Sequence, residues 1–407
     1  MVSDYFYPGK GGVETHIMEL SKHLIKLGHK VIGITHKYPN CPAVASVGKF
    51  KIYYLNIPVF HMNTAFPTTF SHFFLLVDVL VREEIHIVHG HHSMSTLCYD
   101  ALLCAQTLNL KSVFTDHSLF ETGAVENIIV NRVLRFVLQA VDRAICVSYT
   151  LKENLMERTG VDSDIIHVVP NAVSRSFGVS KKSRSGKTIV VSSCRFTYRK
   201  GIDILIQVIP KVCAIVEDLE FVILGDGPKR DELEQMIDDH SLKDRITLLG
   251  SVDHKDVGKV LGRCDVFLNT SLTESFCMAI IEAAACGLHV VSTNVGAVHE
   301  VLPPHIITLV RPDVDEVVEG VVTAVSRLNR KNRRAISRET KKIYDWRRVA
   351  ADTEAVYGCI RDKEVRTLAR RLSDRLLLEP GALSIYFRLA IVISYIFLLI
   401  YKFTHKK

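Results

Sequence analysis

Short apolar stretches alternate along the chain with longer amphipathic ones. Each apolar stretch has the length of a strand buried on both faces, and the longer ones repeat apolar residues at helical spacing. In the first half we predict helices at 13–27 and 95–108, and strands at 30–35, 85–90, 111–116, 143–148 and 167–171. In the second half the same rhythm predicts strands at 188–193, 220–225, 246–250, 265–269 and 288–293. Strands that alternate with helices build parallel sheets, so the predicted fold class is α/β with two doubly wound units.

A polar segment at 174–187 separates the two halves and has the composition of a linker. We therefore expect one Rossmann-like domain over residues 1–173 and a second over residues 188–345. Further helices should occupy residues 346–378, ahead of an apolar segment at 381–401.

Composition is typical of soluble globular proteins. The chain has 407 residues, of which 48% are apolar and 23% charged, and this length leaves room for two domains with full cores. The ten cysteines include no CxxC pair and mostly stand in apolar runs, which is typical of buried thiols in a reducing compartment. Neither a disulfide framework nor a cysteine zinc site is expected.

The apolar C-terminal segment points to a membrane. Residues 389–401 carry no charge, and over residues 381–401 only Arg388 does. About twenty apolar residues cross a bilayer, so we predict a single transmembrane helix at 381–401, with a re-entrant or interfacial helix as the alternative. Basic residues before the segment outnumber those after it, which favours a body on the cytosolic side.

The net charge of +7 is concentrated between Arg327 and Arg348, where ten residues are Lys or Arg. Such a run can be a solvated helix face or a surface that rests on anionic lipid head groups. No aromatic or arginine-rich recognition pattern accompanies the charge, so nucleic acid is not expected as a partner.

Two glutamates, Glu274 and Glu282, stand eight positions apart after the predicted strand at 265–269. We predict that a helix begins just after Ser271 and Thr273, both good N-cap residues, so that both carboxylates lie near one face. Open α/β sheets bind ligands at the carboxyl ends of their strands, and carboxylates there can accept hydrogen bonds from sugar or ribose hydroxyls. Two solvated glutamates on a surface helix are the alternative.

Two other strand ends carry residues suited to phosphate. Arg195 and Lys200 follow the strand at 188–193 and could clamp a pyrophosphate, Arg through its planar fork and Lys as a point charge. Gly225 and Gly227 follow the next strand and could let the backbone approach a nucleotide closely. A pair of surface cations and an ordinary tight turn are the alternative interpretations.

The first domain begins with a glycine-bearing turn. Residues 1–4 look like the end of a strand whose earlier part is absent, so either the chain start is misassigned or the first sheet lacks a full central strand. The turn at 9–14 follows closely and contains Gly11 and Gly12 at the start of a predicted helix. Helix N-termini favour phosphate, although such a turn is also typical of an ordinary loop.

Histidines gather at two strand ends. His89, His91 and His92 form an HxHH pattern, but no acidic or cysteine partner stands at helical spacing, so a zinc site is not expected there. His117 follows another strand and is the histidine that we expect to face a cleft, with a satisfied core histidine as the alternative.

Several of these segments together resemble a known family. They are TSLTESFCMAIIEAAACG (270–287), YRKGID (198–203), GDGPKR (225–230), FTDHSLF (114–120), AICVSYT (144–150) and VVPNAV (168–173). This set resembles the retaining family-4 glycosyltransferases of GT-B fold, and within them the catalytic subunits of phosphatidylinositol N-acetylglucosaminyltransferases. HKDV at 254–257 is a further motif of this subfamily.

The resemblance implies two Rossmann-like domains that face each other across a cleft. It implies retaining transfer of N-acetylglucosamine from UDP-GlcNAc to phosphatidylinositol, the first step of GPI-anchor biosynthesis. It also implies an endoplasmic reticulum membrane location, a catalytic body on the cytosolic face, and a complex with other subunits of the transferase. A retaining transferase acting on a different lipid, or a non-catalytic scaffold subunit, remains the alternative hypothesis.

The resemblance also implies roles for individual residues. Glu274 would contact hydroxyls of the transferred sugar, and Glu282 would contact the ribose of UDP. Arg195 and Lys200 would bind the diphosphate and neutralise the leaving group, which in this fold replaces a divalent metal, so neither a metal nor a cofactor is expected.

The remaining candidates would complete the donor site. His117 would touch the donor sugar near its reacting carbon. The glycines would bring backbone to the nucleotide, and they are Gly11, Gly12, Gly225 and Gly227. One departure stands out, because the family commonly has Gly-Gly-Ile-Pro-Glu after the second glutamate, whereas this chain has GAVHE at 296–300, with His299 in place of the proline.

Overall fold

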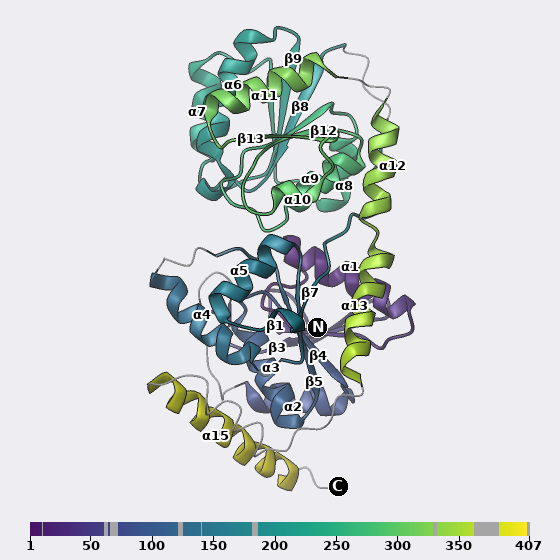
Figure 1. Ribbon diagram of the computed structural model, residues 1–407, viewed down its shortest axis with the longest axis vertical. Helices are drawn as coiled ribbons and strands as arrows, with labels where there is room; N and C mark the ends of the chain where they lie inside the picture. Colours follow the sequence, from purple (N-terminus) through teal and green to yellow (C-terminus); the bar gives the residue numbers. More distant parts are fainter. Residues whose placement is uncertain are drawn as a thin grey trace. The chain divides into compact units, whose positions relative to one another are not determined.

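The computed structural model describes residues 1–9, 11–60, 64–65, 72–120, 125–139, 141–180, 186–328, 332–361 and 382–404. They form two compact units, Met1–Val169 with Arg347–Lys407 and Pro170–Trp346 (Figure 1). In each unit strands alternate with helices around a largely parallel sheet. The predicted α/β class is therefore confirmed.

In the first unit the named strands form two hydrogen-bonded groups. One has the order β1-β3-β2, in which β1 (Ile32–His36) runs parallel to β3 (Phe50–Leu55) and β2 (Val44–Val47) runs antiparallel to it. The other is parallel throughout and has the order β4-β5-β6-β7, with β4 (Ile87–His91), β5 (Lys111–Asp116), β6 (Arg143–Cys146) and β7 (Ile166–Val168). The predicted strands are confirmed, whereas β2 and β3 were not predicted.

A short segment at the start of the chain joins these two groups. Val2 pairs in parallel with Ile34 of β1 and with Gly90 of β4. Its N–H donates to the carbonyl of His89 at 2.9 Å, and its carbonyl accepts from the N–H of His91 at 2.9 Å. The segment therefore bridges the two groups of strands, between β1 and β4. The α-amino group of Met1 is buried and donates to the carbonyl of Ile32 at 2.9 Å, and burial lowers its pKa to about 5.

The helices of the first unit start and stop where the local chemistry requires. Ser95 caps α3 by accepting a hydrogen bond from the N–H of Cys98, and Ser148 caps α5 in the same way. The left-handed residues Asn109 and Gly160 end these two helices. The helices are α1 (Gly12–Lys26), α2 (Phe73–Arg82), α3 (Thr96–Leu108), α4 (Val125–Leu138), α5 (Tyr149–Thr159), α13 (Trp346–Arg361) and α15 (Ala382–Thr404).

The helix α15 lies against the first unit. It packs on α2 and α3, with the ring of Phe397 centred 5.9 Å from that of Phe73 and 5.0 Å from that of Phe74. Its buried residues recur at helical spacing and are Ala390, Ile391, Ser394, Leu398 and Tyr401. One face of α15 is therefore covered by protein.

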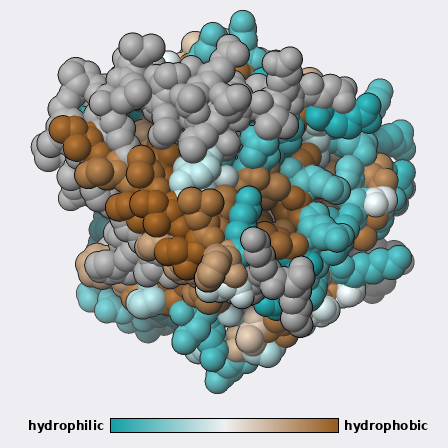
Figure 2. Space-filling model, turned by 90° about the horizontal axis from the view of Figure 1, so that it is seen from below, coloured by the Kyte–Doolittle hydropathy of each residue, from teal (hydrophilic) through white to brown (hydrophobic). Residues whose placement is uncertain are grey.

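The opposite face of α15 is apolar and exposed. Figure 2 views the molecule from this side and shows hydrophobic residues gathered in a band. The exposed apolar residues of α15 are Ile385, Leu389, Val392, Ile396, Leu399, Ile400 and Phe403. Within the part of the chain that the structure describes, no helix is long and apolar enough to cross a membrane, so the transmembrane helix predicted at 381–401 is not supported.

The second unit is built on a parallel sheet with the strand order β10-β9-β8-β11-β12-β13. The strands are β8 (Thr188–Ser193), β9 (Leu219–Leu224), β10 (Ile246–Gly250), β11 (Val266–Asn269), β12 (His289–Thr293) and β13 (Ile307–Val310). The helices are α6 (Ile202–Ile215), α7 (Arg230–Asp239), α8 (His254–Leu261), α9 (Met278–Ala285), α10 (Val298–Val301), α11 (Val314–Ser326) and α12 (Arg333–Ile343). The order changes direction between β8 and β11, and ligands of open α/β sheets bind at such a point.

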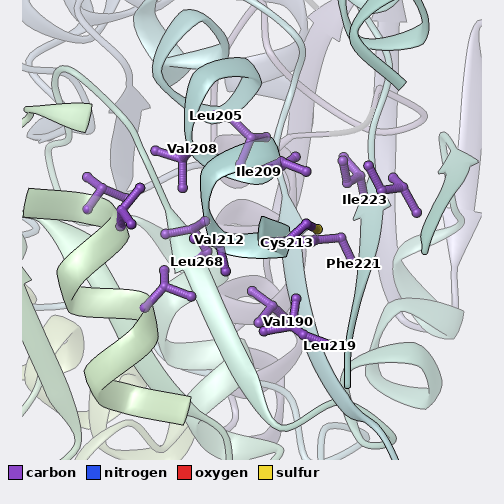
Figure 3. Packing of buried hydrophobic residues seen from close by; sticks show 14 of the residues in the cluster. Val190, Leu205, Val208, Ile209, Val212, Cys213, Leu219, Phe221, Ile223 and Leu268 are labelled. Atoms are coloured by element: carbon purple, nitrogen blue, oxygen red, sulfur yellow. The ribbon is translucent and has the colours of Figure 1, made fainter. Parts of the chain in front are cut away.

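The hydrophobic core of the second unit packs α6 against the sheet. Leu205, Ile209 and Val212 of α6 pack on Phe221 and Ile223 of β9 in one buried cluster (Figure 3). Truncating a buried leucine or isoleucine to alanine costs about 2–5 kcal/mol, so each of these residues contributes substantially to the stability of the unit.

The basic stretch is only partly a surface. Arg333 is buried in α12 and donates to the carbonyl of Gly262 at 2.9 Å, so it holds the helix against the rest of the unit. Arg334, Arg338 and Lys342 are exposed. Arg327, Arg347 and Arg348 are exposed as well, so both interpretations of the basic run still apply to its exposed residues.

Candidate active site

Glu274 and Glu282 are both buried, at 8% and 7% exposure, but they do not share a helix. The predicted helix start just after Thr273 is wrong, because α9 begins at Met278. Cys277 precedes it with a left-handed φ of 68°, which turns the chain between strand and helix. Glu274 therefore lies in the loop after β11, whereas Glu282 lies within α9.

The loop position brings Glu274 to one of the predicted cations. The Nζ of Lys200 donates to the Oε1 of Glu274 at 2.6 Å, and the Oγ of Ser271 lies 2.7 Å from the same oxygen. Burial opposes the charge of Lys200, yet the neighbouring Glu274 carboxylate prevails and raises the pKa of the lysine above its ordinary value. The lysine is thus held as a cation at the carboxyl edge of the sheet.

The other phosphate candidates lie in the segments that follow β8 and β9. Arg195 follows β8 and is exposed. Gly225 follows β9 with a φ of 134°, and a Cβ there would stand 1.8 Å from the carbonyl oxygen of Cys194. Gly227 has a φ of 155°, and a Cβ there would stand 2.6 Å from the carbonyl oxygen of Phe196. Both glycines let the turn after β9 pack directly on the segment that carries Arg195.

Glu282 has a partner that sequence reasoning left unassigned. The Nε2 of His254, at the start of α8, lies 2.7 Å from the Oε1 of Glu282. The imidazole also lies beside Phe177, with ring centroids 5.3 Å apart. HKDV was noted as a motif, but nothing in its spacing relates His254 to a residue 28 positions away.

In the first unit the predicted glycines stand at the start of α1. Gly11 is the residue before the helix, in an extended conformation, and Gly12 is its first residue. A Cβ on Gly11 would come within 2.4 Å of the Glu14 carboxylate, so the Glu14 side chain packs against the glycine turn. A helix N-terminus is suited to an anion, but the Glu14 carboxylate stands close to it in this structure.

The predicted cleft histidine belongs to a buried cluster. His117 after β5 meets His91 at the end of β4 and His16 of α1, and the Nδ1 of His91 lies 3.3 Å from the Nε2 of His117. The ring centroids of His16 and His117 are 4.7 Å apart. Burial lowers the pKa of His91 and of His117 well below the usual range, so both rings are neutral near pH 7.

The three histidines of the HxHH pattern have different partners, although His89 stacks on His91 with ring centroids 4.2 Å apart. Of the three histidines only His91 joins His16 and His117, while His89 contacts Thr115 and His92 contacts Ser118. The ligand atoms of the three clustered histidines lie within 4.8 Å of one another, a separation at which neutral imidazoles can hold a transition metal. The absence of a metal from the predicted mechanism stays a prediction.

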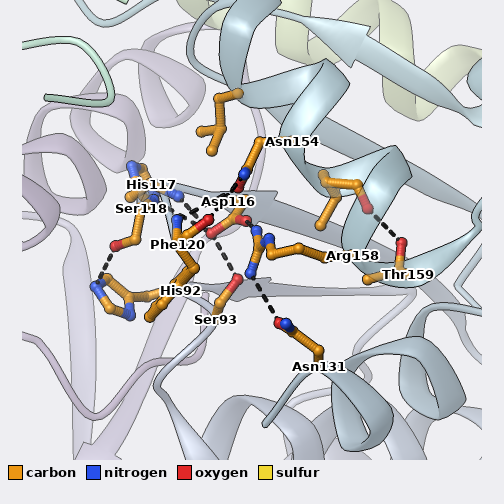
Figure 4. Close-up of polar contacts among 12 residues, drawn as sticks. His92, Ser93, Asp116, His117, Ser118, Phe120, Asn131, Asn154, Arg158 and Thr159 are labelled. Atoms are coloured by element: carbon orange, nitrogen blue, oxygen red, sulfur yellow. Dashed lines mark hydrogen bonds and ion pairs between the residues drawn. The ribbon is translucent and has the colours of Figure 1, made fainter. Parts of the chain in front are cut away.

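A buried ion pair supports the backbone of His117. Asp116, the last residue of β5, accepts from the guanidinium of Arg158 at 2.6 Å and from the hydroxyl of Ser93 at 2.7 Å (Figure 4). It also accepts from the N–H of His117 at 2.8 Å and from the N–H of Ser118 at 3.3 Å. Both side chains of the ion pair are fully buried, and the hydrogen bond from the N–H of His117 to Asp116 therefore holds the backbone at His117 in place.

A cavity of about 1020 Å³ lies elsewhere in the first unit. Residues before β1 and β4 line it, among them Lys30 and Ile85, together with Tyr357 of α13. This is the amino-terminal edge of the sheet, opposite the strand ends that carry His91 and His117. None of the predicted site residues lines this cavity, so it is separate from the candidate site.

Comparisons with known proteins agree with this geometry. Residues 10–177 match the model of Glycosyltransferase Family 4, and residues 176–343 match that of Glycosyl transferases group 1. In solved structures the fold is similar to that of a sucrose-phosphate synthase from Thermosynechococcus elongatus, with a TM-score of 0.70, 19% identity, and 86% of this chain and 94% of the other covered. It is also similar to HepE from Anabaena, with a TM-score of 0.67, 16% identity and coverage of 87% and 98%. The GT-B fold predicted from the motifs is thereby confirmed.

Curated relatives are much more similar in sequence. A phosphatidylinositol N-acetylglucosaminyltransferase subunit of Arabidopsis thaliana is 46% identical over 93% of this chain and 84% of its own length. The human subunit of the same name is 44% identical over 98% of this chain and 84% of its own length, and the gpi3 subunit of Schizosaccharomyces pombe is 44% identical over 94% and 84%. The chain therefore belongs to the family of phosphatidylinositol N-acetylglucosaminyltransferase subunits that these three relatives represent, a family of GT-B glycosyltransferases.

Proposed function

We propose that the protein transfers N-acetylglucosamine from UDP-GlcNAc to phosphatidylinositol with retention, as the catalytic subunit of the enzyme that begins GPI-anchor synthesis. The observation that carries this proposal is the Lys200–Glu274 pair. Two residues that the motifs assign to diphosphate and sugar meet at 2.6 Å where a doubly wound sheet binds ligands. The names of the curated relatives supply the transferred sugar and the acceptor, and the family resemblance supplies UDP as the carrier.

The cations stabilise the leaving group. As the bond between the anomeric carbon and the β-phosphate oxygen breaks, UDP gains negative charge. Lys200 is held as a cation beside Glu274, and Arg195 is exposed nearby in the chain, so both can meet that charge without a metal. Electrostatic stabilisation prepared in advance is usually the largest catalytic contribution.

The carboxylates orient the donor. Glu274 accepts hydrogen bonds from sugar hydroxyls, and Glu282 accepts them from the ribose. An inositol hydroxyl then forms a bond to the anomeric carbon on the face that UDP leaves, and its proton passes to the departing phosphate oxygen. Attack and departure on one face retain the anomeric configuration.

The first unit contributes His117 and the glycine turn. The Asp116–Arg158 pair fixes the backbone at His117, and burial keeps its imidazole neutral. A neutral imidazole can donate one hydrogen bond to a sugar hydroxyl without repelling the cations. Gly11 and Gly12 would present backbone N–H groups to the diphosphate once the Glu14 side chain moves aside.

The apolar face of α15 attaches the protein to a membrane in this proposal, with the body on the cytosolic face of the endoplasmic reticulum. Its exposed side chains include Leu389, Ile396, Leu399 and Phe403, and an apolar helix face of this kind can lie in the interface of a bilayer. The exposed cations of α12 are suited to anionic head groups. Other subunits of the transferase would be its partners, since the relatives are named as subunits.

The test is transfer of radiolabelled N-acetylglucosamine from UDP-GlcNAc by membranes that carry the full chain and its partner subunits. We expect product with phosphatidylinositol and none with phosphatidylcholine. Lys200→Ala and Glu274→Ala should each lower the rate at least 100-fold. Lys211→Ala is the matched control, because that lysine pairs with the exposed Asp315, and it should keep full activity. Wild-type rates in both site variants would show that catalysis is not the role of this chain.

A further inference from the structure

His254 and Glu282 form a contact that the family motifs do not explain. His254 is the first residue of α8 and Glu282 lies in the middle of α9. Their side chains meet at 2.7 Å between Nε2 and Oε1. Glu282 is 7% exposed, whereas nearly half of the His254 side chain is exposed. The histidine therefore lies between the buried carboxylate and the solvent.

The imidazole is held from a second side. Phe177 is fully buried, and its ring centroid lies 5.3 Å from that of His254 at an interplanar angle of 58°. The same ring is fixed by α8, since a Cβ placed on Gly258 would stand 3.3 Å from its Cδ1. The ring of His254 therefore has one edge on a carboxylate and one face near a fixed aromatic ring, which restricts its rotation.

We propose that His254 is a positioning residue for the nucleotide, and this rests on the ribose contact of Glu282 in the proposed function. An ionised carboxylate has about four acceptor positions, so one hydrogen bond from the Nε2–H of His254 leaves room for ribose hydroxyls. The bond also fixes the carboxylate plane, because a side chain held at one oxygen cannot turn freely about its last torsion. His254 thus acts on the ribose through Glu282 and does not touch the reacting atoms.

If His254 positions Glu282, its removal should affect some ligands and not others. Loss of His254 should weaken only those ligands that use Glu282, and hydrogen bonds to charged groups are strong enough for that loss to be measured. UDP has two ribose hydroxyls, whereas 2′,3′-dideoxy-UDP has neither and keeps the uracil and the diphosphate. The ratio of the two dissociation constants therefore isolates the contribution of the ribose hydroxyls.

The experiment is titration calorimetry of the full chain with UDP and with 2′,3′-dideoxy-UDP. We expect wild type to bind UDP at least 10-fold more tightly than the dideoxy nucleotide, and His254→Ala to lose most of that preference. His254→Gln should keep it, because the amide nitrogen of Gln can stand where Nε2 stands. In a Glu282→Gln background, His254→Ala should have no further effect, since coupled residues are not additive.

A matched control separates positioning from general damage. His305 also pairs with a carboxylate, that of Glu339 at 3.0 Å, but on an exposed surface. His305→Ala should leave the preference for UDP unchanged. The inference is overturned if His254→Ala keeps the wild-type preference, or if wild type itself shows none. The transfer assay described above tests the proposed function independently of these binding measurements. If the protein transfers the sugar but shows no preference for UDP over the dideoxy nucleotide, the role of His254 is overturned and the proposed function stands.

Discussion

Replacing Arg158 by Met should destabilise the first unit by about 3 kcal/mol. The guanidinium of Arg158 and the carboxylate of Asp116 are fully buried and 2.6 Å apart, and removing one partner of such a pair costs about 3–5 kcal/mol because the other charge is left without compensation. Asp116 keeps its hydrogen bonds from Ser93 and from the N–H of His117, which places the expected loss at the lower end. This is a large part of the 5–15 kcal/mol that typically stabilises a domain.

Hydrogen exchange at the amides of β5 measures this loss, because those amides exchange only when the unit opens. Arg82→Met is the control, since Arg82 pairs with Asp78 on the surface, and exposed pairs contribute less than about 1 kcal/mol. The double variant Arg158→Met with Asp116→Asn should recover part of the loss, because it removes the uncompensated charge. If Arg158→Met costs no more than Arg82→Met, the buried pair does not hold the strand end as argued.

Three further predictions follow from other features. Burial lowers the pKa of His92 to about 4, so between pH 6.5 and 4 this residue binds a proton in the unfolded chain and not in the folded one; wild type should therefore lose about 3 kcal/mol more stability than His92→Gln as pH drops through this window, and equal losses in urea midpoints for the two proteins would contradict this. Gly225→Ala should unfold the turn after β9 and abolish UDP binding, because its Cβ would stand 1.8 Å from a carbonyl oxygen, whereas Gly48→Ala, with nothing within 4 Å, should cost only about 1 kcal/mol and keep binding; equal thermal shifts would contradict this. Leu399→Lys places a charge on the exposed face of α15 and should lower the fraction of protein that sediments with liposomes at least 5-fold, with thermal stability unchanged; an unaltered fraction would exclude this face from the membrane.

The repeating elements of both sheets could be predicted because each is encoded locally. An apolar run bounded by polar turns predicts a buried parallel strand wherever it stands, and β8, β9, β11 and β12 follow that rule. The strand β3 is buried and pairs in parallel with β1, so the rule applies to it and it was overlooked. The strand β2 was missed because it alternates exposed and half-buried residues and pairs antiparallel at the edge. Such a strand lacks the continuous apolar run on which the prediction relied.

Site residues that directly follow a predicted strand could be predicted from the sequence. Site residues that only the tertiary fold brings together were missed. Lys200 and Glu274 each follow a strand, so their meeting could be anticipated from the parallel sheet. His16 stands within an ordinary amphipathic helix, and its contact with His117 depends on which strands are neighbours, which no spacing in the sequence specifies. The start of α9 was misplaced because Cys277 takes a left-handed conformation that only glycine signals in a sequence.

The ion pair between Lys200 and Glu274 also has a consequence for ligand selectivity. The charges of Lys200 and Glu274 compensate each other. An inorganic phosphate that drew Lys200 away would therefore leave the buried Glu274 carboxylate without a counter-charge. A complete sugar nucleotide supplies an anion for the lysine and hydroxyls for the glutamate at the same moment. We therefore expect an anion that engages Lys200 alone to bind less tightly than one that also brings a hydrogen-bond donor to Glu274.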